Sequence, residues 1–106
     1  MKDHDAAASI SRAFALERLD RRLEAGEQVT MDEVKAYLVE HLTRLLDGNP
    51  ALLMSILYRI DVAERDVKAV FATCSPPAVP DRLADLIVER QLQKLRLRRQ
   101  YGETGE

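Results

Sequence analysis

Apolar residues recur at helical spacing along most of this chain of 106 residues, and short polar, glycine- or proline-containing segments separate the apolar stretches. The first stretch predicts a helix that Ser9 or Ser11 caps and that ends near Ala25, with Gly26 as its left-handed stop. Residues 1–8 are expected to form a flexible lead-in. The apolar face of this first helix consists of Ile10, Ala13, Phe14, Leu16, Leu19 and Leu23.

A second helix begins with the clearest start signal in the chain. Glu33 follows Thr30 at the spacing of a capping box, in which each side chain accepts a hydrogen bond from the backbone of the other residue. Residues 47–50 end this helix and start the next one, with Asn49 as the cap and Pro50 in the first turn. The positions at helical spacing between the two signals are Val34, Leu38, His41, Leu42, Leu45 and Leu46.

The third helical layer is expected to break near Asp61. Residues 51–57 are apolar on nearly all sides, which is typical of a central, buried helix. Glu64 then follows Asp61 at the spacing of a second capping box. We therefore expect the helix to break at residues 60–62, and we expect Asp61 to cap a second short helix.

The last helix is predicted from about Pro80 to Tyr101, with Gly102 as its stop, and residues 102–106 are expected to form a flexible tail. Three long helices and one broken helix indicate an all-α fold. We expect residues 1–106 to form a single domain, built as an antiparallel four-layer helical bundle. The apolar stripe of the last helix consists of Leu83, Ala84, Ile87, Val88, Leu92 and Leu95.

The composition supports a single globular domain. Apolar residues make up 46% of the chain and charged residues 32%, so one hydrophobic core can form without a disulfide or a metal. The single cysteine, Cys74, excludes an intrachain disulfide and fits a reducing compartment. Residues 51–57 are too short an apolar run to cross a bilayer, and residues 1–5 lead into no secretory segment. We therefore expect a cytoplasmic protein.

The residue types that catalysis requires are scattered. His4 lies in the expected lead-in, and His41 lies on the second predicted helix, where a half-buried structural role is typical. No histidine accompanies Cys74 in the sequence, no metal-ligand spacing occurs, and no glycine-rich loop is present to hold phosphate. We therefore expect no enzyme activity, no cofactor and no metal.

Basic charge is concentrated on the last helix, although the net charge of the chain is −2. Residues 90–99 contain five cations and no acid. Cations at the end of a helix complement the helix dipole, and they can also form a docking patch for an acidic partner. The five cations are Arg90, Lys94, Arg96, Arg98 and Arg99.

An apolar pair lies among these cations. Leu97 and Tyr101 are four residues apart and share one edge of the helix. They can form a small interface core, or they can fold back onto the first helix near Phe14. The first interpretation predicts a non-catalytic module for protein–protein interaction, with a homodimer as one form. The charged rim of this interface would be Arg96, Arg98 and Arg99.

Asp61 and two of the cations form a candidate polar cluster. Arg90 and Lys94 lie one turn apart beside the apolar stripe of the last helix, and Asp61 lies where the third layer breaks. A carboxylate at this point can accept from a cation on the neighbouring layer and so specify the register of the two layers. Alternatively, Asp61 only caps the helix that follows it.

DNA binding is an alternative function, and it depends on residues 52–72. Residues 57–71 resemble the core of repressor-type helix-turn-helix proteins, and this resemblance implies that Arg65 and Lys68 face the DNA. Asp61 stands where that motif prefers glycine. Neighbouring acids leave the reading face with little net positive charge, so nucleic acid is not the partner that we favour.

A second resemblance covers roughly the second half of the chain. Residues 57–62, 83–87 and 90–94 read Leu-Tyr-Arg-Ile-Asp-Val, Leu-Ala-Asp-Leu-Ile and Arg-Gln-Leu-Gln-Lys. These segments are similar to a group of small all-helical bacterial proteins without an assigned function. The resemblance implies a helical fold and a bacterial cytoplasmic origin, and it implies no activity.

Overall fold

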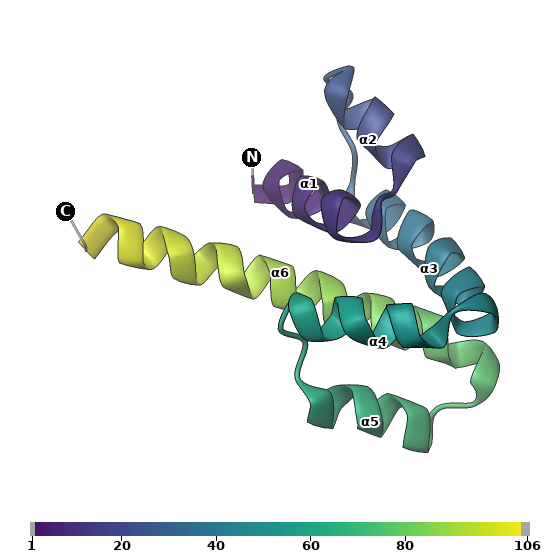
Figure 1. The fold of residues 1–106 in the computed structure, drawn as a ribbon. Coiled ribbons are helices and arrows are strands. Elements are labelled where there is room, and N and C mark those ends of the chain that lie inside the picture. The colour runs from purple at the N-terminus through teal and green to yellow at the C-terminus, as the bar shows by residue number, and fades with distance from the viewer. Residues whose placement is uncertain (1, 105–106) are drawn as a thin grey trace.

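The computed structural model describes the backbone of residues 2–104 and the side chains of residues 4–98. Within residues 2–104 the chain forms six α-helices and one short 3-10 helix, without a strand, so the all-α class is confirmed (Figure 1). The elements are α1 (Lys2–Phe14), α2 (Glu17–Glu24), α3 (Met31–Gly48), α4 (Pro50–Arg59), α5 (Glu64–Thr73), η1 (Pro76–Ala78) and α6 (Val79–Thr104).

The last helix, α6, organises the packing. It contacts α1, α3 and α5, while α3 also contacts α1 and α4. Figure 1 shows the C-terminal turns of α6 projecting beyond the other helices. The expected antiparallel four-layer bundle is not confirmed, because α1, α3 and α5 pack on α6 whereas α2 packs mainly on α1 and α4 mainly on α3. The largest fully buried side chains include Ile10, Phe14, Leu19, Leu38, Leu42, Leu53, Leu83 and Ile87.

The N-terminal prediction is wrong in its boundaries. Residues 2–8, expected to be a flexible lead-in, form the first turns of α1, and Ala6 and Ala7 are fully buried. The expected single helix to Ala25 ends instead at Phe14, and a separate helix, α2, follows. Small residues at the start of α1 allow this close packing, and the apolar pattern alone does not reveal it.

A buried serine accounts for the break between α1 and α2. Ala15 adopts a left-handed conformation with φ of 53°, and the N–H of Leu16 donates to the carbonyl of Ser11 at 2.9 Å. The Ser11 hydroxyl is fully buried and lies 2.7 Å from Asp20 Oδ1 and 3.1 Å from the Leu16 carbonyl. These contacts offset the roughly 1–2 kcal/mol that a left-handed alanine costs.

The start of α3 agrees with the prediction. Glu33 N donates to Thr30 Oγ1 at 3.1 Å, and Thr30 N donates to Glu33 Oε1 at 3.1 Å, so the capping box is complete. The start of α4 also agrees, since Leu52 N donates to Asn49 Oδ1 at 3.2 Å and Pro50 lies in the first turn.

The break near Asp61 is confirmed, but its mechanism differs from the prediction. Asp61 has a φ of 64°, Val62 N donates to the Leu57 carbonyl at 3.1 Å, and Asp61 N donates to the Tyr58 carbonyl at 3.2 Å. This pair of bonds is a Schellman motif, so Asp61 ends α4. The expectation that Asp61 caps the next helix is wrong, because Ala63 occupies that position without a side-chain hydrogen bond.

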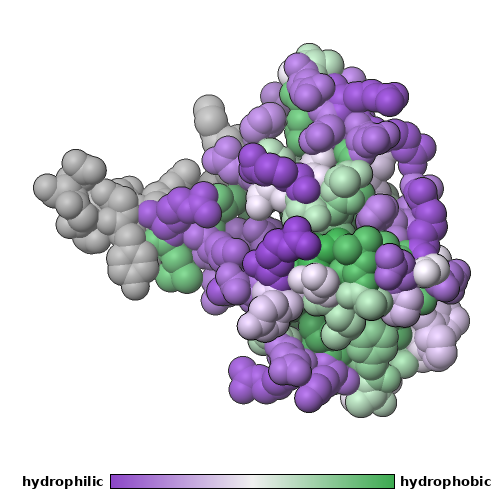
Figure 2. Space-filling model, viewed as in Figure 1, coloured by the Kyte–Doolittle hydropathy of each residue, from purple (hydrophilic) through white to green (hydrophobic). Residues whose placement is uncertain are grey.

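The interpretation of α4 as a central helix is also wrong. Its inner side buries Leu53, Ile56 and Leu57, but Met54 is 44% exposed and Tyr58 is 86% exposed. Figure 2 shows apolar surface in the region that α4 occupies in Figure 1. The neighbouring helices cover only one side of α4, so the apolar residues on its other side remain accessible.

The last helix is longer than predicted. It runs from Val79 through Gly102 to Thr104, so Gly102 is not its stop. Residues 102–104 therefore continue the helix in place of the expected tail, and residues 105–106 lie outside the described part of the chain. Within the predicted stripe, Leu83, Ala84 and Ile87 are fully buried.

Candidate functional site

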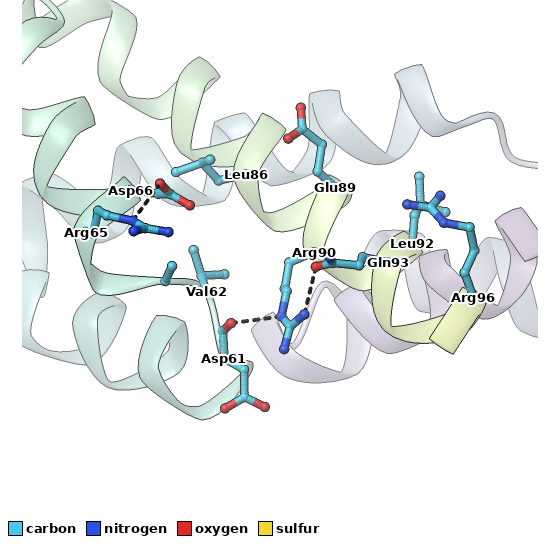
Figure 3. A pocket seen from close by; sticks show the side chains of 11 residues that line it. Asp61, Val62, Arg65, Asp66, Leu86, Glu89, Arg90, Leu92, Gln93 and Arg96 are labelled. Carbon is cyan, nitrogen blue, oxygen red and sulfur yellow. Dashed lines mark hydrogen bonds and ion pairs between the residues drawn. The ribbon is translucent and has the colours of Figure 1, made fainter. Parts of the chain in front are cut away.

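A groove of about 610 Å³ lies between the start of α5 and the middle of α6 (Figure 3). Side chains that are far apart in the sequence meet along it, because the turn after α4 directs the chain against α6. Its charged lining consists of Arg65, Arg90, Arg96, Asp61, Asp66 and Glu89. Its apolar lining includes Val62, Leu86 and Leu92.

The predicted cluster of Asp61, Arg90 and Lys94 is brought together at one end of this groove. Arg90 Nε donates to the backbone carbonyl of Asp61 at 2.9 Å, and Arg90 Nη1 donates to Gln93 Oε1 at 2.7 Å (Figure 3). Lys94 Nζ lies 3.4 Å from Asp61 Oδ2 and 3.5 Å from the Ile60 carbonyl. The two cations therefore neutralise the C-terminal end of α4 as well as a carboxylate.

The ion pair in this cluster is exposed. The Asp61 side chain is 62% accessible and that of Lys94 is 28% accessible. An exposed pair of this kind contributes about 0–1 kcal/mol to the free energy of unfolding. It therefore orients the two side chains more than it stabilises the fold. The carbonyl of Asp61 gains its partner from α6 because the left-handed turn points it away from α4.

The basic end of α6 continues from the groove along the projecting turns. Arg96 lines the groove, Arg98 is exposed, and Leu97 is 42% exposed. Leu97 is not part of the core among the described residues, where the Phe14 ring contacts His41 on α3 at a centroid distance of 6.2 Å. The other predicted members of this surface, the side chains of Arg99 and Tyr101, lie outside the described residues.

Arg65 and Lys68, the predicted DNA contacts, lie on the exposed face of α5. Arg65 is 91% accessible and its Nε lies 4.0 Å from Asp66 Oδ1. Lys68 is 76% accessible and its Nζ lies 3.6 Å from Glu64 Oε2. Each cation on this face therefore has a carboxylate beside it, which lowers the local positive potential.

Two further groups of electrostatic contacts join helices to one another. Arg22 on α2 lies 2.6 Å from Glu33 Oε2 on α3, and this contact is the main cause that holds the pKa of Glu33 below its ordinary value. Lys35 on α3 contacts both Asp81 and Asp85 on α6, which raises the pKa of the lysine. These contacts hold α2, α3 and α6 in place.

His41 lies half-buried on α3. Burial lowers the pKa of its imidazole, and the nearby charge of Arg44 lowers it further. The ring packs edge-on against Phe14, so its surroundings are those of a structural residue. Among the described residues, no group of three or more His, Cys, Asp or Glu side chains is placed to hold a metal ion.

The sequence interpretation missed one surface. Leu52, Met54 and Tyr58 of α4 and Phe71 of α5 are large apolar residues that are 41–86% exposed. The sequence could have predicted this exposed apolar surface. A ten-residue helix that is apolar on nearly all sides cannot bury every side in a chain of this size.

Comparisons with protein-family models, with curated proteins and with solved structures each gave no match. Within the described part of the chain, no helix combines the length and the apolar character needed to cross a membrane.

Proposed function

We propose that this chain is a non-catalytic helical module that binds a partner protein through the α5–α6 groove and the adjoining end of α6. The observation that carries the proposal is the joint placement of Arg90, Arg96 and Leu97. The two arginines line an open groove with apolar side chains in its wall, and the exposed leucine follows on the same helix. Arginine beside desolvated apolar groups is the combination that tends to dominate binding energy at protein interfaces.

The charge along the C-terminal half of α6 supports an acidic partner. Residues 90–98 contain four cations and no acid, and they are Arg90, Lys94, Arg96 and Arg98. Lys94 contacts Asp61, and Arg90 donates to the Asp61 carbonyl and to Gln93, which leaves Arg96 and Arg98 to meet carboxylates. We therefore propose that the partner presents a segment with Asp or Glu residues around one or two apolar side chains. Charges at the rim of such an interface mainly increase the association rate and its dependence on salt.

Site-specific photo-crosslinking in the native host tests this proposal. A photoreactive residue at position 97 is expected to give one dominant protein adduct, and the purified partner from that adduct should then bind the module in solution. A photoreactive residue at position 21, where an exposed arginine stands on α2, is the matched control, since α2 and α5 lie on opposite sides of the molecule in Figure 1. Equal adducts from the two positions, or none from position 97, would contradict the proposal.

Self-association is a second candidate form of the same function, and the outer face of α4 favours it. Leu52, Met54 and Tyr58 are exposed on a helix that carries no acid and a single cation, Arg59. Two copies can therefore approach this face without like-charge repulsion. Sedimentation of the protein, compared with a Met54→Asp/Tyr58→Asp variant, tests it, since a dimer through α4 should dissociate in the variant.

DNA binding has weaker support. The chain has two short helices joined by a short turn, as the alternative requires, but α5 buries Val67 and Val70 and presents acids beside Arg65 and Lys68. Helices that enter a DNA groove gain affinity from phosphate contacts, and neighbouring carboxylates oppose those contacts.

A further inference from the structure

A second groove, of about 310 Å³, lies between α1 and the C-terminal half of α6, and it shares no lining residue with the α5–α6 groove. Its volume is at the lower end of the range for small-molecule sites. The polar side chains that line it come from both helices and are Asp5, Ser9, Arg12, Gln91, Lys94 and Arg98.

The groove is positively charged. Three cations and one acid give a formal charge of +2, from Arg12, Lys94 and Arg98 against Asp5. The ammonium of Lys94 lies near Asp61 Oδ2, at 3.4 Å. Arg12 and Arg98 are exposed, and among residues 4–98 neither has an ion-pair partner. Two guanidinium groups, one from each helix, are therefore available to a ligand in this groove.

Gln91 supplies an independent indication that this groove binds a ligand. Its side chain lines the groove but is only 5% exposed, and its Oε1 accepts a hydrogen bond from Ser9 Oγ at 3.0 Å. Its Nε2 is buried without a hydrogen-bond partner. Reversing the amide does not remove the deficit, because the oxygen then takes the unpartnered place. An unpartnered buried amide has a free-energy cost, so an apolar side chain would serve the core better at this position.

We propose that this groove binds a small phosphate monoester, with Arg12 and Arg98 contacting the phosphate oxygens and the Gln91 amide donating to the ligand. Guanidinium groups match the geometry of phosphate oxygens and can bind them in pairs. A phosphate monoester carries about −1.5 to −2 charges near pH 7, which the two guanidinium groups can offset. Nε2 is closed from solvent in the free protein, so the Gln91 side chain has to turn away from Ser9 and into the groove before its amide donates to the ligand.

Asp5 selects among such ligands. Its carboxylate lies at the same groove and opposes additional negative charge on the ligand. It also offers an acceptor for a hydroxyl group. A phosphate monoester with a hydroxylated body, such as glycerol 3-phosphate, therefore fits this lining better than inorganic phosphate alone.

The test is a titration of the full chain with glycerol 3-phosphate, followed by backbone amide chemical shifts at constant ionic strength. Saturable shifts confined to α1 and the adjoining turns of α6 are expected. The Arg12→Gln/Arg98→Gln variant should bind at least about tenfold more weakly, because it loses two charge-assisted contacts. The matched control, Arg21→Gln/Arg59→Gln, changes two other exposed arginines and should bind like the parent.

The Gln91→Met variant separates a binding role from a structural one. If the amide is kept for a ligand, this variant should melt at a higher temperature than the parent and bind glycerol 3-phosphate more weakly. A lower melting temperature with unchanged affinity would overturn the assignment of Gln91. Shifts that do not saturate, an equal loss in the control variant, or equally tight binding of succinate would overturn the phosphate site itself.

Discussion

Arg90 of α6 donates a hydrogen bond from Nε to the backbone carbonyl of Asp61, 2.9 Å away, and so ties the last helix to the turn that ends α4. That carbonyl is available because Asp61 holds a left-handed conformation with φ of 64°. One residue therefore ends a helix, redirects the chain toward α5 and anchors it to α6. Asp61 and Arg90 both line the α5–α6 groove, so this contact joins its two walls.

Substitutions at Asp61 should separate its backbone role from its charge. Asp61→Gly is expected to leave stability unchanged or to raise it slightly, since glycine adopts a positive φ without strain and the lost ion pair with Lys94 is exposed. Asp61→Val should be less stable than Asp61→Gly by about 1–2 kcal/mol, because a β-branched residue is strained in this conformation. Urea denaturation measures the unfolding free energy of both variants. Equal stability of the two variants would show that the turn does not require a left-handed residue.

Neighbouring leucines on α4 provide a matched pair for the core. Leu53 is fully buried, and Leu53→Ala is expected to cost about 2–5 kcal/mol of unfolding free energy. Leu52 is 41% exposed, and Leu52→Ala should cost about 1 kcal/mol or less. Thermal and chemical unfolding of the two variants checks the orientation of α4. A reversed order would mean that α4 presents its other side to the core.

Stability should fall on mild acidification because of His41. Burial lowers the pKa of this imidazole in the folded protein, with a further contribution from Arg44, so the folded protein takes up the proton less readily than the unfolded chain. The stability that depends on neutral His41 is complete above its ordinary pKa of 6.5 and is lost as the pH falls through 6.5 toward the folded pKa.

His41→Gln removes this titration. The melting temperature of the variant should therefore decrease less than that of the parent between about pH 7 and pH 5. Parallel pH profiles for the two proteins would show that the protonation of His41 is not coupled to folding.

No specific duplex DNA binding is expected at physiological salt. Arg65 and Lys68 are exposed but lie beside Asp66 and Glu64, so the outer face of α5 has little net positive charge. Fluorescence anisotropy with labelled duplexes at several salt concentrations measures this. Submicromolar binding that weakens steeply with salt and disappears in an Arg65→Ala/Lys68→Ala variant would favour the helix-turn-helix function.

The features that the sequence predicted correctly are those with local causes. The capping box of Thr30 and Glu33 and the cap at Asn49 are formed by residues within one turn, and both are present in the structure. The break at Asp61 was also predictable from its position after an apolar run. Its mechanism was not, because the hydrogen bonds that select a left-handed Asp61 involve the whole end of α4.

Features that depend on tertiary packing were not predictable from local patterns. The break at Ala15 has no glycine to mark it, and it relies on contacts of the buried Ser11. The exposure of Tyr58 follows from how many helices surround α4. The placement of Arg65 and Arg96 along one groove likewise requires the packing of α5 on α6.

Affinity for the crosslinked partner, measured with the Arg96→Glu/Leu97→Asp variant, tests the central proposal most directly. Both side chains are exposed, so the melting temperature should match that of the parent, whereas the affinity should fall by at least about tenfold through charge reversal and loss of the apolar contact. The Arg21→Glu variant should bind like the parent. Undiminished affinity of the double variant, with its fold intact, would contradict the assignment of partner binding to the α5–α6 groove and the end of α6.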